Sequence, residues 1–186
     1  MKKSFGPKVM PFPAPVWVVG TYDAEGKPNM MTASWTGICC SKPPCIAVSL
    51  RKTRYSYSNI LARQAFTICV PSRQYAKEVD YWGMVSGNDA DKVAKSGLSA
   101  VAGEFVDAPY IKEFPVAMEC KLLHTVEIGS HTQFIGEVLD LKVDQAMLGP
   151  EGHPDVEKLG VFVYFDGYRG IGEYLARPFS IGKELL

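Results

Sequence analysis

The chain has 186 residues, 47 % of them hydrophobic and 22 % charged, so it can bury a sizeable core and lacks the composition of a disordered protein. Its 20 basic and 20 acidic residues give a formal net charge of zero, which argues against nucleic-acid binding and is compatible with self-association. No apolar run approaches the roughly 18–20 residues that cross a bilayer, and prolines interrupt the segment after the basic N-terminus. We therefore predict a soluble, cytoplasmic protein without a membrane segment or signal peptide.

The chain is predicted to begin with an extended, proline-rich arm at residues 1–13 and to continue as a β-hairpin. Strand 16–22 is rich in β-branched and aromatic residues, and the turn 23–26 ends in a glycine that can take a positive φ. The returning strand, 29–36, has two different faces by simple alternation. These are Thr32, Ser34 and Thr36 on one face, and Met31, Ala33 and Trp35 on the other.

Short helices and further strands are predicted up to the middle of the chain. The clearest helix opens at Arg54-Tyr55-Ser56 and runs to about Gln64, because apolar residues recur at helical spacing and Ser56 can serve as the N-cap. The other elements are strands at 45–50 and 66–70, a helix from Ser72 through Trp82, and a short helix that ends at Gly97.

The second half of the chain is predicted to be mostly β-structure, with candidate strands at 116–128, 131–143 and 161–165 and a tail at 176–186. Many strands, few short helices and hairpin turns are typical of an all-β barrel with short helical insertions. The alternating strand–helix rhythm of a doubly wound sheet is missing. We therefore predict a mainly β protein in which residues 1–186 form one domain.

Five cysteines are present, most of them inside apolar, strand-like runs, and no pair has the CxxC spacing. Free, buried and reduced thiols are the simplest interpretation, although a redox or metal role stays open. Only three histidines occur, and they are scattered, so no metal site is predicted. The five positions are Cys39, Cys40, Cys45, Cys69 and Cys120.

Residues 51–56 place three cationic side chains and two hydroxyl side chains where a strand ends and a helix begins. The first N–H groups of a helix point outward without partners, so such a junction is suited to an anion, and the Arg54 guanidinium adds a bidentate donor. A solvated loop face is the plain alternative for the same residues. The cluster reads Arg51, Lys52, Thr53, Arg54, Tyr55 and Ser56.

Two other features are candidates for a binding site, and each has a structural alternative. Strand 29–36 carries small hydroxyls that leave its backbone open to a flat partner, but it would also serve as an ordinary barrel strand with Trp35 in the core. Ser86-Gly87 fits either a capped turn or a loop bordering a ligand. His131 beside a turn is commonly structural, and it could instead position a proton or hydride donor. Rossmann, Walker, HExxH and GxSxG motifs are absent.

The order and spacing of these motifs over about residues 15–174 resemble the flavin reductase-like FMN-binding split-barrel family, and within it the flavoredoxin group. The cysteine pair departs from the family's usual pattern. Ser56 stands where a threonine is frequent, a mild change because both side chains donate the same hydroxyl. The motifs are Asp23-x-x-Gly26, Asn29-x-x-Thr32-x-Ser34-Trp35, Arg54-Tyr55-Ser56, Ser86-Gly87, Asp91-Lys92 and Ser130-His131-Thr132-x-Phe134-Ile135-Gly136-Glu137.

The resemblance implies a split β-barrel and a homodimer with one FMN per subunit near the dimer interface. The isoalloxazine would lie against the backbone of 31–36, with the phosphate near residues 49–56 and His131 on the substrate side. No metal, membrane or nucleic-acid partner is implied. The predicted cofactor-binding residues are Asn29, Met31, Thr32, Ala33, Ser34, Trp35, Thr36, Ser49, Leu50, Lys52, Thr53, Arg54, Tyr55, Ser56, Ser86 and Gly87.

Three functions remain open on the sequence. The leading hypothesis is a flavoprotein that carries electrons between a reduced donor and a redox partner protein, with the chemistry supplied by FMN. An NAD(P)H-dependent flavin oxidoreductase is the alternative, because relatives with that activity also lack a Rossmann motif. A β-barrel binding module without redox activity is the third.

Overall fold

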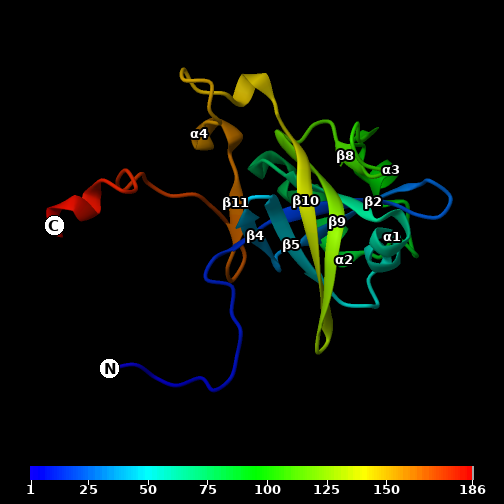
Figure 1. Ribbon diagram of the computed structural model, residues 1–186, viewed down its shortest axis with the longest axis horizontal. Coiled ribbons are helices and arrows are strands. Elements are labelled where there is room, and N and C mark those ends of the chain that lie inside the picture. Colours follow the sequence, from blue (N-terminus) through cyan, green and yellow to red (C-terminus); the bar gives the residue numbers. More distant parts are fainter. Residues whose placement is uncertain (186) are drawn as a thin grey trace.

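The computed structural model describes residues 1–185, and its centre is a seven-stranded antiparallel sheet in the order β3-β2-β6-β9-β10-β5-β4 (Figure 1). Its strands are β2 (Trp17–Tyr22), β3 (Pro28–Ala33), β4 (Thr36–Ser41), β5 (Pro44–Leu50), β6 (Ala65–Val70), β9 (Val116–Ile128) and β10 (His131–Val143). The helices are α1 (Tyr55–Arg63), α2 (Ala76–Met84), α3 (Lys92–Ser96) and α4 (Val156–Leu159), with 3₁₀ turns at Arg73–Tyr75, Gln145–Met147 and Ile181–Leu185.

The two edges of this sheet, β3 and β4, are consecutive in the chain and are joined only by Ser34 and Trp35. In a flat sheet, six strand spacings of about 4.8 Å would separate the edges by roughly 29 Å. Three peptide units reach at most about 11 Å, so the sheet must curl until its edges meet. The edges do not pair with each other, which makes the sheet a split barrel and confirms the predicted fold.

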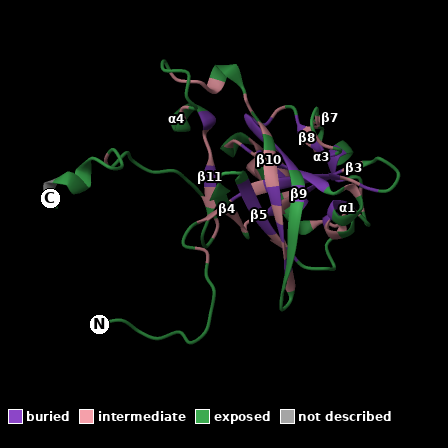
Figure 2. Cartoon of the chain, in the orientation of Figure 1, coloured by how far each residue is buried: buried purple, intermediate pink, exposed green. Residues whose placement is uncertain are grey.

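The interior of the barrel is filled by one hydrophobic cluster and its outer side by a second. Phe66 and Phe134 are fully buried in the first cluster, and Trp82 of α2 is fully buried in the second. Gly136 faces Phe66 so closely that a Cβ atom there would lie 2.6 Å from the ring. Figure 2 shows these buried segments gathered in the body of the molecule, while the chain ends are exposed.

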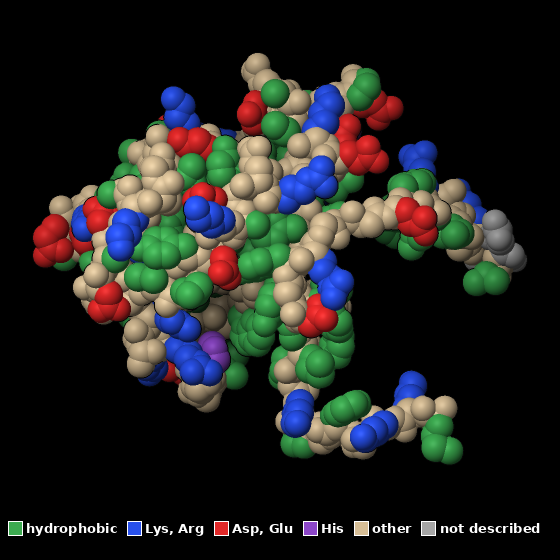
Figure 3. All heavy atoms as spheres, turned by 180° about the vertical axis from the view of Figure 1, so that it is seen from behind, with side chains coloured by type: hydrophobic (Ala, Val, Ile, Leu, Met, Phe, Trp, Pro, Cys, Tyr) green, Lys and Arg blue, Asp and Glu red, His purple; other side chains and the backbone are tan. Residues whose placement is uncertain are grey.

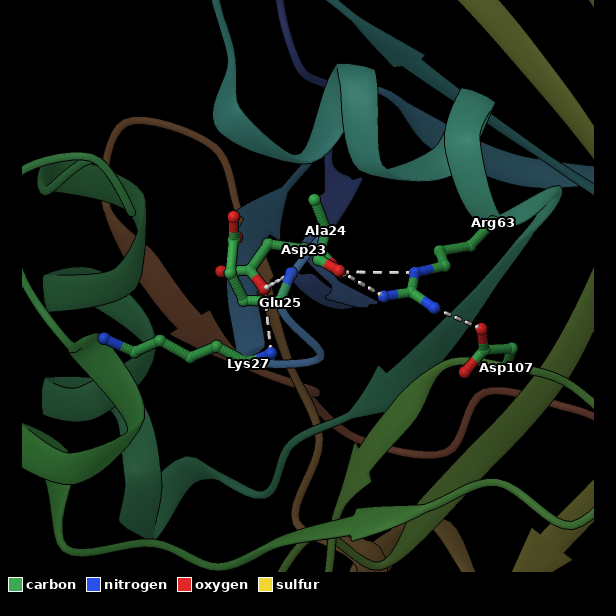
Figure 4. Close-up of polar contacts among 6 residues, drawn as sticks. All are labelled: Asp23, Ala24, Glu25, Lys27, Arg63 and Asp107. Atoms are coloured by element: carbon green, nitrogen blue, oxygen red, sulfur yellow. Dashed lines mark hydrogen bonds and ion pairs between the residues drawn. The ribbon is translucent and has the colours of Figure 1, made fainter.

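The turn between β2 and β3 anchors α1 at both ends through Asp23, and Figure 4 shows the contacts of Arg63 at the C-terminal end. The Asp23 carboxylate accepts hydrogen bonds from the Lys27 N–H (2.8 Å) and from the Tyr55 hydroxyl at the start of α1 (2.8 Å). The Arg63 guanidinium at the end of α1 donates to the Asp23 carbonyl (3.2 Å) and pairs with Asp107 (2.9 Å). Since both ends of α1 are tied to this turn, the turn sets where the N-terminus of α1 lies.

Two smaller sheets complete the structure: β1 (Ala14–Pro15), β11 (Phe162–Tyr164) and β12 (Tyr168–Gly170) form one, and β7 (Ala100–Ala102) with β8 (Pro109–Ile111) forms the other. Beyond the first of these sheets, both chain ends project from the body as extended arms that carry exposed hydrophobic side chains (Figures 1 and 3). Residues 1–13 contain no helix or strand and are almost entirely exposed. Among residues 1–185, no helix is long and apolar enough to cross a membrane.

Several local predictions are confirmed and others are wrong. Strands 116–128 and 131–143 occur with the predicted bounds, and Gly26 has a φ of +80° in its turn. The strand predicted at 29–36 ends at Ala33, because the chain must bend there to reach the opposite edge of the sheet. Ser56 is not the N-cap of α1; Arg54 occupies that position without a side-chain cap, because the Ser56 hydroxyl is buried and bonded elsewhere. Five short strands were not predicted: β1, β4, β7, β8 and β12.

Candidate functional site

Two adjoining cavities open along the joint between the barrel edges. The smaller encloses about 140 Å³ and the larger about 530 Å³, and they share Ser34, Trp35 and Ser49 on their walls. The larger cavity alone falls within the roughly 300–1,000 Å³ of typical small-molecule sites. The smaller cavity is lined by Met31, Thr32, Ala33, Ser34, Trp35, Ser49, Leu50, Arg51, Arg54, Gly83 and His131.

Residues of β3, with Ser34 and Trp35 that follow it, form one wall of the smaller cavity, and their side chains do not all face the cavity. Met31 and Ala33 are only 8 % exposed and pack in the barrel core, whereas Trp35 is 44 % exposed at the joint. The Thr32 hydroxyl donates to the Val79 carbonyl of α2, so it is used for packing. The Trp35 carbonyl accepts the Ser49 N–H at 2.8 Å and holds the joint against β5. The two faces expected from simple alternation are therefore not formed, because the bend at Ser34 breaks the alternation, and the structural alternative that buries Trp35 in the core is wrong.

A second group of predicted residues meets behind this wall. The buried Asn29 side chain donates to the Ser56 hydroxyl at 2.9 Å and thereby links β3 to the first turn of α1. A Cβ atom on Gly87 would lie 2.4 Å from the Tyr55 ring and 2.6 Å from the Asn29 amide oxygen, so only glycine allows the Ser86–Gly87 loop to approach here. Burial and the Asp23 carboxylate together raise the pKa of Tyr55 to about 12, so its hydroxyl stays protonated at neutral pH.

Two side chains of the cationic cluster border the smaller cavity, and the third, Lys52, borders neither cavity. Arg51 and Arg54 line the smaller cavity, and neither forms an ion pair with any carboxylate of residues 1–185. Lys52 instead pairs with Glu127 at 2.8 Å on the exposed hairpin of β9 and β10. Thr53 is exposed and lines neither cavity. The two arginines thus leave an unbalanced positive charge at one end of the site.

Lys92, at the start of α3, is a third cation near Arg54, and it was named in the Asp91-Lys92 motif but was not predicted to be a site residue. Its side chain is only 4 % exposed, and its ammonium donates to the Trp82 carbonyl at 3.2 Å. Burial, with a smaller contribution from nearby Arg54, lowers the pKa of Lys92 to about 8. A buried ammonium held by one neutral carbonyl is incompletely compensated, which is the environment an anion would relieve. The signal in the sequence was a lysine that directly follows the helix-capping Asp91 and precedes the apolar Val93 and Ala94.

The remaining predicted residues lie at the edges of the cavities. Thr36 lines the larger cavity, and its hydroxyl is buried without a hydrogen-bond partner among the described residues. His131 lines the smaller cavity beside Ser130, whose hydroxyl lies 2.9 Å from its Nδ1. The Ser86 hydroxyl accepts the Asn88 N–H at 3.2 Å and shapes the turn before Gly87.

The arrangement is suited to a ligand with a flat, largely apolar body and an anionic end. Hydrophobic and hydroxyl-bearing residues line the joint, and the Thr36 hydroxyl offers a free donor there. Arg51 and Arg54 offer positive charge at the other end, and the buried Lys92 lies near Arg54 without lining either cavity. Arginine binds phosphate in a bidentate manner, and a phosphate dianion would offset the cost of burying Lys92.

Comparisons with known proteins agree with this geometry. Residues 9–172 match the flavin reductase like domain family. The flavoredoxin of Desulfovibrio vulgaris (Miyazaki F) is 51 % identical over 98 % of this chain and 100 % of its own, with a TM-score of 0.93. The flavoredoxin from Methanosarcina acetivorans is 29 % identical over the whole of both chains, also with a TM-score of 0.93.

Among curated proteins, an uncharacterised protein of Archaeoglobus fulgidus is 35 % identical over 70 % of this chain. The aligned segment spans 72 % of that relative, but only 46 % and 63 % of the next two. These three matches therefore cover 70 %, 64 % and 60 % of this chain and only part of each relative.

Proposed function

This chain belongs to the flavin reductase-like family, and from that premise we propose that it is an FMN-binding flavoprotein that acts in electron transfer. The observation that carries the proposal is that Arg51 and Arg54, which have no carboxylate partners among residues 1–185, line one end of the cavities along the barrel joint, with the buried Lys92 near Arg54. FMN has a planar ring system at one end and a phosphate at the other, which matches the two ends of the site. When bound, FMN supplies the redox chemistry, and the protein supplies binding and orientation.

The residues have separate parts in this proposal. Arg51, Arg54 and Lys92 hold the phosphate, and the backbone from Met31 to Thr36 holds the ring system. The Thr36 hydroxyl, which lacks a partner within the described part of the chain, supplies one hydrogen bond to a polar edge of the ring. Asn29, Ser56, Tyr55 and Gly87 position the start of α1, and through it Arg54, by contacts with one another.

Electron transfer is favoured over flavin reduction because the 51 % identical neighbour, matched over its whole length, is named a flavoredoxin. A carrier of this kind would exchange electrons with a partner protein through a small, transient surface. The alternative, an NAD(P)H-dependent flavin oxidoreductase, is tested by following NAD(P)H oxidation with added free FMN. Sustained turnover would favour the reductase, and its absence together with reversible reduction of bound flavin would favour the carrier.

We also propose that the protein is a homodimer. Hydrophobic side chains on the two projecting arms are strongly exposed, among them Phe12 at 68 %, Leu175 at 83 % and Phe179 at 97 %. Trp35 and Ile38 expose further apolar surface beside the cavities, at 44 % and 79 %. A second subunit would cover this surface and enclose the site. Light scattering after size-exclusion chromatography at micromolar concentration checks this, and a monomer mass would contradict it.

The visible spectrum of the purified protein tests the central proposal, followed by release and chromatography of any chromophore. Two flavin absorption bands, with FMN as the released species, are expected. If the protein is colourless, titration with added FMN is the second measurement, because cofactor can be lost during purification. A colourless protein that also fails to bind added FMN would overturn the assignment and leave a barrel without a flavin.

A further inference from the structure

Three of the five cysteines lie on the β4–β5 hairpin, and none of them is among the residues proposed to hold the flavin. Cys39 and Cys40 are exposed on β4, and Cys45 is buried at the start of β5. Lys42 and Pro43 form the turn between the two strands. The burial predicted for the cysteines is therefore wrong for Cys39 and Cys40, because β4 is the edge strand of the sheet and only β5 pairs with it.

The strand register places Cys40 directly opposite Cys45. Directly opposed residues of an antiparallel pair have Cα atoms about 4.5–5.5 Å apart, and their side chains lie on the same face. A disulfide needs Cα atoms about 4.4–6.8 Å apart, so this pair can be bridged without moving the backbone. Adjacent Cys39 sits at an irregularity in the pairing between Ile38 and Cys40, and it has no directly opposed partner on β5.

The face that carries these thiols is the face of the cavities. Along β5, Ile46, Val48 and Leu50 point into the barrel core, so Cys45 and Ser49 alternate onto the opposite face. Ser49 lines both cavities, and Cys39 lines the larger one. The hairpin cysteines therefore lie at one end of the groove, and the cationic cluster lies at the other.

The surroundings of the two opposed cysteines differ. Cys45 is 5 % exposed, and burial, followed by the nearby Cys40, Cys39 and Glu137 side chains, raises the pKa of its thiol. Cys40 is open to solvent, so a small reagent reaches it first. Cys69 and Cys120 are fully buried in the hydrophobic clusters and have no access to such a reagent. Among residues 1–185, no three metal-ligating side chains converge on one point.

From this register we infer that Cys40 and Cys45 form a redox-active dithiol, which closes to a reversible disulfide by exchange with a low-molecular-weight disulfide. This site is separate from the proposed FMN site, and its chemistry needs no flavin.

The exchange proceeds in two balanced steps. The Cys40 thiolate attacks one sulfur of the small disulfide, which breaks its S–S bond, releases one thiol and leaves a mixed disulfide on Cys40. Cys45 then loses its proton to solvent, attacks the Cys40 sulfur and releases the second thiol. The protein thus loses two electrons and two protons, and the small disulfide gains them. The product links edge strand β4 covalently to β5 at the end of the groove.

The test is incubation of the purified full-length protein with oxidised glutathione and a metal chelator, followed by intact mass measurement and peptide mapping. We expect the mass to fall by two hydrogen atoms, the map to link Cys40 to Cys45, and a reducing dithiol to restore the starting mass. Cys39→Ser is the matched control and should close as the wild type does. Cys45→Ala, which keeps a small apolar side chain in the buried position, should stop at a glutathione adduct on Cys40.

Two results would overturn the inference. One is a wild-type protein that remains fully reduced or that keeps glutathione on Cys40, because Cys45 would then fail to resolve the adduct. The other is a disulfide that includes Cys39 and is lost in Cys39→Ser. Because neither readout involves flavin, failure here leaves the proposed FMN function untouched, and failure of FMN binding leaves this result unaffected.

Discussion

The polar cluster around Asp23 and the cationic cluster around Arg54 lie at α1, but they differ in how completely their charges are compensated. The Asp23 carboxylate accepts bonds from the Glu25 and Lys27 N–H groups and from the Tyr55 hydroxyl. Arg63 is bonded to Asp23, Ala24 and Asp107, and Figure 4 shows all of these contacts except that of Tyr55. Arg54 has neither an ion pair nor a side-chain hydrogen bond within residues 1–185.

This difference separates a structural polar cluster from a candidate ligand site. Burial opposes ionisation of Asp23, but the hydrogen bonds from Lys27, Tyr55 and Glu25 outweigh it and lower the pKa of this carboxyl. Around Lys92 the described residues offer the neutral Trp82 carbonyl but no carboxylate, and burial lowers the pKa of its ammonium to about 8. A cluster whose charges are paired within the protein stabilises the fold. A cluster with unpaired positive charge instead favours the binding of an anion.

The largest expected effect is the loss of stability when the hydrogen bonds around Asp23 are removed. Asp23→Ala removes the acceptor of three hydrogen bonds and leaves the Tyr55 hydroxyl and two backbone N–H groups without it. We expect a loss of about 3 kcal/mol in the free energy of unfolding, measured by urea denaturation. Asp166→Ala is the control, because that carboxylate is exposed and pairs only with Arg169. Equal stability of the two variants would contradict a structural role for Asp23.

Breaking the uncompensated cluster should instead affect ligand binding. Arg54→Ala should weaken FMN binding by roughly 1.5–3 kcal/mol, the contribution of a charge-assisted hydrogen bond, while the free energy of unfolding without flavin stays unchanged. Quenching of flavin fluorescence during titration measures the affinity, and riboflavin, which lacks the phosphate, is the comparison ligand. A variant with wild-type affinity for FMN would refute the phosphate assignment of Arg54.

The pH dependence of the unfolding free energy tests whether Lys92 is a buried cation without a carboxylate partner. Its folded-state pKa of about 8 lies below the roughly 10.4 of an unfolded lysine, so the unfolded state binds the extra proton between these values. Stability contributed by this group therefore rises with pH in that window. Relative to Lys92→Met, the flavin-free wild type should gain about 2 kcal/mol in unfolding free energy between pH 7 and pH 9.5.

Lys95→Met, an exposed lysine on the same helix, is the control for this pH series. Its stability should follow that of the wild type at every pH. If the difference between the wild type and Lys92→Met stays constant across the series, Lys92 does not titrate in this window and is not the uncompensated cation described here.

The smallest expected effect on FMN affinity is that of replacing Lys52. Its ammonium pairs with Glu127 on the exposed hairpin, and the pair raises the pKa of Lys52 and lowers that of Glu127. Exposed pairs of this kind contribute little, and the side chain lines neither cavity. Lys52→Ala should therefore keep wild-type FMN affinity in the titration used for Arg54→Ala. A loss as large as that of Arg54→Ala would place Lys52 in the phosphate site.

Much of the fold and part of the candidate site could be predicted from local patterns. Alternation and β-branched residues locate the long strands at 116–128 and 131–143, since both are long enough for the pattern to repeat. Arg54 was selected because a strand-to-helix junction with basic residues is visible over six positions. Lys92 was not, because the burial that distinguishes it comes from Trp82 and from residues distant in the chain.

The sequence by itself determined the long β-strands 116–128 and 131–143, the hairpin turn at Gly26 and the basic junction before α1, because each depends on neighbours within a few residues. Only the tertiary structure decided where the sheet closes, which cations lack carboxylate partners, and that Cys40 faces Cys45. These features depend on strand order and register, which bring together residues far apart in the chain. Ser34 and Trp35 show where local patterns are insufficient. The alternating pattern predicts a strand that continues through them, but closure of the barrel bends the chain there.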